Sequence, residues 1–114
     1  MIARVSHLSV VQKVYDFELY IYDILEKFPR SERYAMITRL KNTLRELIRR
    51  LIKAGESDKK KGHLYDADCE LKFLKYEFRL AKDLRYISLN RYKIISEKLN
   101  EVGSMLGGWI KNLA

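Results

Sequence analysis

The chain has 114 residues, enough for one domain with a single hydrophobic core and too few for a second folding unit. Leu, Lys, Arg, Glu and Ile dominate and proline occurs once, which predicts an all-α protein. The single cysteine excludes an intrachain disulfide, and no apolar run approaches the ~18 residues of a membrane-spanning helix. The opening MIARVSHLSVVQK lacks the apolar segment of a signal peptide, so we expect a cytoplasmic protein without membrane contact.

The net charge of +8 indicates an acidic partner, although solvated helix faces alone can carry such an excess. Residues 1–30 hold four basic and four acidic side chains, and residues 64–86 hold five of each. Residues 31–54 hold seven basic against two acidic side chains, a net of +5. The excess of positive charge is therefore expected on one helix.

The first helix is expected at about residues 8–28. Its apolar residues alternate in steps of four and three, the period of a helix packed nearly parallel to its neighbours. They are Val10, Val14, Phe17, Ile21, Ile24 and Phe28. The helix should stop before Pro29, because the residue that precedes a proline is pushed out of the α region.

The second helix is expected at about residues 32–54, after an N-cap at Ser31 and before Gly55 as the C′ residue. Its apolar residues are Ile37, Leu40, Leu44, Leu47 and Leu51. Residues 55–62, GESDKKKG, carry a glycine at each end and no apolar side chain. This segment is predicted to be an exposed connection.

The third and fourth helices are expected at about residues 63–84 and 89–112, the latter after an N-cap at Ser88. The third has Leu64, Ala67, Leu71, Leu74, Phe78 and Ala81 along one face, and the fourth has Tyr92, Ile95, Leu99, Val102, Leu106 and Trp109. Four helices of similar length with short connections predict one antiparallel, up-down-up-down four-helix bundle over residues 1–114.

Several apolar residues lie off these faces, namely Leu19, Ile48, Ile52, Phe73, Leu80, Ile94, Met105 and Ile110. Either the helices have wide core-facing stripes, or some of these side chains are buried against other subunits. Gly103 and Gly107, four residues apart beside Trp109, thin the fourth helix on one side. This spacing allows a close contact with the first helix or with a neighbouring subunit, and a local fit within the monomer is an equal alternative.

The second helix carries the candidate binding surface. Lys41, Arg45, Arg49 and Lys53 fall within an arc about 120° wide, opposite the apolar face, and Arg39 and Arg50 widen it. With Lys59, Lys60 and Lys61 of the following connection, this arc could bind a phosphodiester backbone by charge without reading bases. The alternative is a solvated helix face. A second basic row on the third helix is interrupted by Glu77 and Asp83, which we expect to pair with it locally.

Residues that could support catalysis are few. His7 and His63 lie in separate polar segments without a second ligand at metal-binding spacing, and a lone Cys69 in a helix is typical of a small apolar filler. No glycine-rich phosphate loop follows a strand. We therefore expect no enzyme activity, no metal and no cofactor.

Four segments resemble a known family. FPRSERY (28–34) is similar to the first helical corner of a group of four-helix bundles encoded in intervening sequences of bacterial 23S rRNA genes. LIKAGES (51–57), LYDADCELKFLKYEFRLA (64–81) and EVGSMLGGWIK (101–111) resemble one branch of that group, the accessory variability proteins (Avd) of diversity-generating retroelements. The rRNA-associated branch has small residues and Asn in its second helix, where this chain has the bulkier, basic LRELIRRLIKAGE (44–56).

The resemblance implies properties that composition does not show. It implies a homopentameric barrel with a positively charged surface that binds RNA or DNA and the reverse transcriptase of the element. It further implies a non-catalytic role in adenine-mutagenic copying of the template RNA into cDNA. The alternative is a structural or protein-interaction bundle of the rRNA-associated type.

Overall fold

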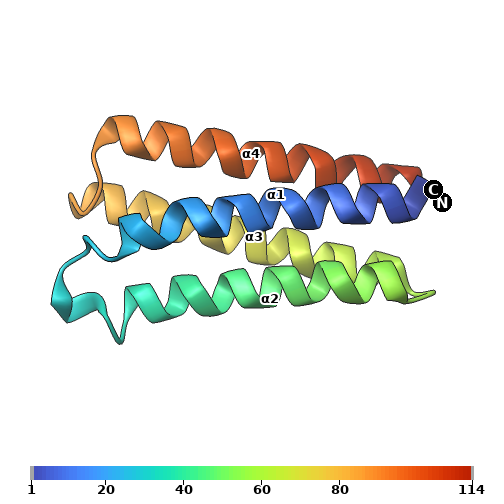
Figure 1. Ribbon diagram of the computed structural model, residues 1–114, viewed down its shortest axis with the longest axis horizontal. Helices are drawn as coiled ribbons and strands as arrows, with labels where there is room; N and C mark the ends of the chain where they lie inside the picture. The colour runs from blue at the N-terminus through green and yellow to red at the C-terminus, as the bar shows by residue number, and fades with distance from the viewer. Residues whose placement is uncertain (1, 114) are drawn as a thin grey trace.

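The computed structural model describes residues 2–113, with side chains from residue 9 onward, and all four expected helices are present. They are α1 (Ile2–Leu25), α2 (Met36–Glu56), α3 (Lys60–Asp83) and α4 (Leu89–Asn112), with a short 3₁₀ helix, η1 (Arg30–Glu32), before α2. No strand occurs within residues 2–113. The helices alternate in direction along an elongated molecule of 43 × 25 × 19 Å (Figure 1). The all-α four-helix bundle is confirmed.

Each helix packs against two neighbours, so the bundle is a closed square of contacts. α1 lies against α2 and α4, and α3 lies against the same two helices; the contact of α2 with α3 is the most extensive. Nearly all of the predicted apolar residues are buried in one core, where the rings of Phe17 and Phe78 meet edge to face at 5.9 Å. Ile37 and Tyr92 are half-buried at its margin.

The apolar residues off the predicted faces divide into two groups. Five of them are half-buried beside the core, as wide stripes predict: Ile48, Leu80, Ile94, Met105 and Ile110. Leu19, Ile52 and Phe73 remain exposed by 61%, 45% and 42%. A wide core stripe therefore explains most of the set and leaves three large side chains in solvent.

The first corner departs from the predicted helix ends. α1 ends at Leu25 rather than residue 28, because the N–H groups of Lys27 and Phe28 bond three residues back as the chain turns toward Pro29. α2 begins at Met36 rather than residue 32, and Ser31 is not its cap. The carboxylate of Glu32 replaces that cap, accepting a hydrogen bond of 3.3 Å from the Met36 N–H. At the other end of the first helix, α1 begins at Ile2 instead of residue 8.

The predicted connection at 55–62 is much shorter in the structure. α2 includes Gly55 and ends at Glu56, while α3 begins at Lys60. The ammonium group of Lys60 donates to the carbonyls of Ala54 (2.9 Å) and Gly55 (3.4 Å), so a side chain satisfies the end of α2. The expected N-cap of α4 is present, since the Ser88 hydroxyl accepts from the Arg91 N–H at 3.0 Å.

Candidate nucleic-acid interface

The arginines of the predicted arc are tied to carboxylates. Arg39 donates two hydrogen bonds, of 3.2 and 3.3 Å, to Glu77 on α3, whose side chain is almost fully buried. The hydrogen bond that Arg39 donates to the Glu77 carboxylate raises the pKa of Arg39 further above its ordinary value. Glu77 was expected to pair within α3, and that expectation is wrong, because the carboxylate lies in the seam facing α2. Arg39 therefore joins two helices.

The other three arginines also have acidic partners. Arg45 lies 3.2 Å from Glu18 of α1. Arg49 pairs with Glu46 one turn earlier at 3.1 Å. Arg50 lies 3.4 Å from Asp66 of α3 and 4.0 Å from Glu46. Arg45 and Arg49 nevertheless keep about 60% of their side-chain surface exposed, so their charges face solvent on one side.

The lysines of the predicted set have different surroundings. Lys60 caps α2 through its ammonium group and is only partly exposed. Lys41 lies over the ring of Tyr22, 4.6 Å from its centroid. Within residues 9–113, no carboxylate lies within ion-pair distance of Lys41, Lys53, Lys59 or Lys61. The lysines, rather than the arginines, are the cations of this set without an acidic partner.

The antiparallel arrangement moves the charge excess from one helix to the two ends of the bundle. The end formed by residues 23–41 and 76–93 has ten basic and five acidic side chains, a net of +5 (Figure 1). The opposite end, formed by residues 2–12, 49–68 and 104–113, has eight basic and four acidic residues, a net of +4. The remaining middle has five basic and six acidic residues, a net of −1. A polyanion is therefore attracted to the ends.

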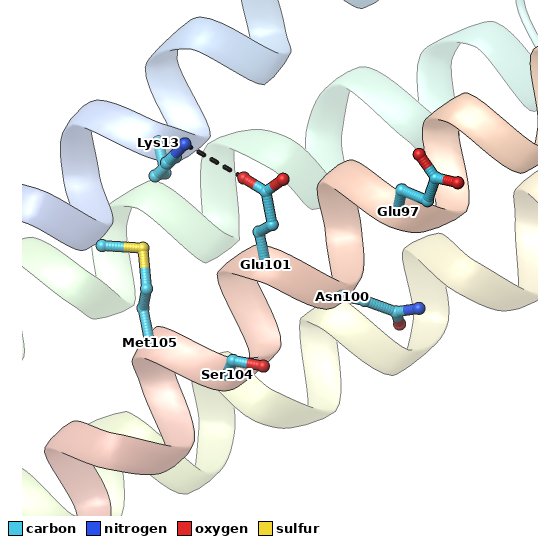
Figure 2. Close-up of a pocket in the computed structure, with 6 residues that line it drawn as sticks. All are labelled: Lys13, Glu97, Asn100, Glu101, Ser104 and Met105. Atoms are coloured by element: carbon cyan, nitrogen blue, oxygen red, sulfur yellow. Dashed lines mark hydrogen bonds and ion pairs between the residues drawn. The ribbon is translucent and has the colours of Figure 1, made fainter.

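A shallow groove between α1 and α4 lies in the middle part of the bundle, where basic and acidic residues nearly cancel. Lys13 of α1 donates to Glu101 of α4 at 3.0 Å across this groove, with Glu97, Asn100 and Ser104 along the same side of α4 (Figure 2). Met105 supplies its apolar wall. With one cation against two carboxylates, the groove is unsuited to a phosphate.

The glycines of α4 have less to contact than expected. A Cβ atom at Gly103 would meet Leu71 of α3 at 3.4 Å, an ordinary contact, and one at Gly107 would meet nothing within 4 Å. The predicted approach to the first helix is therefore wrong for Gly103, which faces α3. Trp109, in contrast, is buried in the core with 2% of its surface exposed. Gly107 has no local fit to explain it, and the alternative of a neighbouring subunit stays a prediction.

Across the described residues, His, Cys, Asp and Glu form no group of three that could hold a metal ion. Cys69 is exposed on α3, and the side chain of His7 lies outside the described residues. Within residues 2–113, every helix lacks the apolar length needed to cross a bilayer.

Two exposed arginines at the first corner were not predicted as site residues from the sequence. Arg30 and Arg33 of FPRSERY are exposed, and within residues 9–113 no carboxylate lies within ion-pair distance of either. Arg30 was counted in a neutral segment and Arg33 was assigned to a longer second helix. Arg30 and Arg33 are three residues apart in a turn that starts at Pro29, and this spacing could have indicated that they lie on one side of the turn.

Comparison with known proteins places this basic bundle in a family. A family model described as bAvd-like matches residues 8–113. The chain belongs to the bAvd-like family. This confirms the resemblance to Avd found in the sequence. No curated protein matches the chain.

One solved structure has the same four-helix fold. It is a protein of unknown function from the S23 ribosomal protein family of Bacteroides thetaiotaomicron, with a TM-score of 0.82. The superposition covers 93% of this chain and 98% of that one, at 17% sequence identity. At such low identity the likeness shows the four-helix fold and carries no function with it.

Proposed function

We propose that this bAvd-like protein is a non-catalytic accessory protein of a diversity-generating retroelement. In this role it binds template RNA or cDNA and the reverse transcriptase of the element, and so supports mutagenic cDNA synthesis. The family match over residues 8–113 is the observation that carries the proposal. The net charges of +5 and +4 at the two ends give it a physical basis, because phosphates are bound largely by Lys and Arg with release of counterions.

The proposed assembly is a homopentamer. Three large apolar side chains, Leu19 of α1, Ile52 of α2 and Phe73 of α3, are exposed to solvent, and contacts with further subunits would cover them. Five copies of the 13.6 kDa chain give a particle of about 68 kDa. Light scattering on the purified protein measures this mass directly, and a monomer at micromolar concentration contradicts the assembly.

RNA binding is tested by titrating a labelled single-stranded RNA at several salt concentrations. The affinity should fall steeply with salt, with a slope close to the number of phosphates that are neutralised. Co-purification with the reverse transcriptase of a diversity-generating retroelement tests the second partner. Affinity for neither RNA nor DNA at low salt would contradict the nucleic-acid role.

A second candidate function is a structural or protein-interaction bundle of the rRNA-associated type. The pairing of Arg39, Arg45, Arg49 and Arg50 with carboxylates favours it, since charges neutralised within the protein attract polyanions less strongly. Substituting Lys53 and Lys59 by Glu separates the two candidates. A nucleic-acid-binding protein should lose affinity and activity, whereas a protein-interaction module should keep its activity.

A further inference from the structure

A cavity of about 420 Å³ lies at the first corner, between the end of α1, η1 and the first turns of α2. It is more enclosed than the groove between α1 and α4, and its volume is within the range of small-ligand sites. Apolar side chains and three cations line it: Leu25, Phe28 and Ile37, with Arg30, Arg33 and Lys41. The cavity thus presents a mostly polar, positively charged surface, with Ile37 and Pro29 as its accessible apolar part.

The local backbone places these cations together. Side chains three residues apart in a 3₁₀ turn eclipse one another, which brings Arg30 and Arg33 to the same side of η1. Ile37 and Lys41 are four residues apart and share one face of α2. The Thr38 hydroxyl donates to the Arg33 carbonyl at 2.8 Å and fixes the turn against the helix. The fold therefore holds the backbone that carries these three cations in one place.

The charge in this cavity is only partly neutralised by the protein. Glu26 is the one carboxylate among the lining residues, against three cations, which leaves a net of +2. The nearby Glu32 does not line the cavity, because its two oxygens accept from the Met36 N–H and the Tyr86 hydroxyl. An anion with about two charges would complete the site.

We propose that this corner cavity binds a terminal phosphate monoester at the end of a nucleic acid strand. A monoester carries about −1.5 to −2 charges at pH 7 and three strong acceptor oxygens, whereas a phosphate within a strand carries one charge. Two arginines match such oxygens with paired N–H donors. Pro29 and Ile37, the accessible apolar residues of the lining, then contact the adjoining sugar or base. The proposal rests on the nucleic-acid role proposed above and names a site for it.

The test compares two short oligouridylates that differ only in a phosphate or a hydroxyl at the 5′ end, each labelled at the 3′ end. The full-length protein should bind the phosphorylated RNA roughly tenfold more tightly, as expected for new charge-assisted hydrogen bonds. The preference should shrink as the pH falls below about 6, where the monoester gains a proton. Equal binding of the two RNAs overturns the site.

A pair of double variants assigns the preference to the corner. Arg30→Gln with Arg33→Gln should abolish it, while Lys72→Gln with Lys111→Gln removes the same charge away from the corner and should keep it. All four side chains are exposed, so both variants should fold, which circular dichroism checks. A preference that survives in the corner variant overturns the proposal.

Uridine 5′-monophosphate distinguishes a strand end from a free nucleotide. If it competes as well as the phosphorylated RNA, the phosphate alone supplies the binding and the site stands; weaker competition shows that the strand contributes as well. Equal, salt-sensitive binding of both RNAs leaves the nucleic-acid role intact and removes only this site. If RNA does not bind at all, that role fails, and the site stands only if the nucleotide shifts the NMR signals of Arg33 and Ile37.

Discussion

The outer face of α2 and the corner between α1 and α2 are both rich in arginine, yet their charges differ in availability. On α2, neighbouring helices and the preceding helical turn supply a carboxylate to each of the four arginines. At the corner, Arg30 and Arg33 lie on a short 3₁₀ turn between two helices. Among the described residues, no carboxylate lies within ion-pair distance of either side chain there. The number of basic residues in a segment is therefore a poor measure of the positive field it presents.

The largest expected effect tests how much the ion pair between Arg39 of α2 and Glu77 of α3 contributes to stability. Arg39→Met should lower the free energy of unfolding by about 2 kcal/mol, because it leaves the buried Glu77 carboxylate without its partner. Glu77→Met should cost clearly less, since the half-exposed guanidinium of Arg39 can turn to water. Urea unfolding of both variants measures the asymmetry. Equal losses would show that the ion pair acts only through its charge attraction.

The next test concerns Glu32, the corner carboxylate that accepts hydrogen bonds from within the protein. Glu32→Ala should destabilise the protein by about 1–2 kcal/mol, because it removes the acceptor for the Met36 N–H and for the Tyr86 hydroxyl. Glu26→Ala is the matched control, an exposed carboxylate of the same corner, and should change stability by less than about 0.5 kcal/mol. Thermal unfolding of both variants decides whether Glu32 holds the corner.

The hydrogen bond from the Tyr86 hydroxyl to Glu32 also predicts how stability changes at alkaline pH. The hydrogen bond to Glu32 raises the pKa of Tyr86 above the ordinary value of about 10, because an ionised phenol could no longer donate to the carboxylate. This contribution to stability is complete below that ordinary value and is lost as the pH rises through the pKa of the folded protein. Tyrosinate absorbance should show one tyrosine that ionises at a higher pH in the unmodified protein and is missing in the Tyr86→Phe variant. A Tyr86→Phe variant with an unchanged alkaline stability profile would contradict this.

Sequence periodicity predicted the bundle well because burial follows the helical repeat. The steps of three and four placed nearly every core residue, and the fourth helix runs over the predicted residues, Leu89–Asn112. The two ends of α2 are set by side chains that lie just outside this helix. Glu32 rather than Ser31 caps α2, and Lys60 satisfies its last carbonyls from beyond the connection, so local cap rules placed both ends wrongly.

The candidate site was less predictable than the fold, for a related reason. A helical wheel places Arg45 on the outer arc of α2 but cannot show that Glu18, from another helix, lies beside it. The wheel also cannot show that Arg30 and Lys41, on either side of a turn, line one cavity. Which charges are neutralised is decided by packing between elements, and that information is absent from the spacing within one element.

The smallest expected effect returns to the arginines of α2. Arg45→Gln with Arg49→Gln should weaken RNA binding only about twofold, because each guanidinium already has a carboxylate that a phosphate must share or displace. Arg30→Gln with Arg33→Gln removes the same charge and should weaken binding of a 5′-phosphorylated RNA roughly tenfold. Fluorescence anisotropy at one fixed salt concentration measures both. A larger loss from the α2 pair would mean that RNA breaks these ion pairs on binding, and the outer face of α2 would then be the main contact surface.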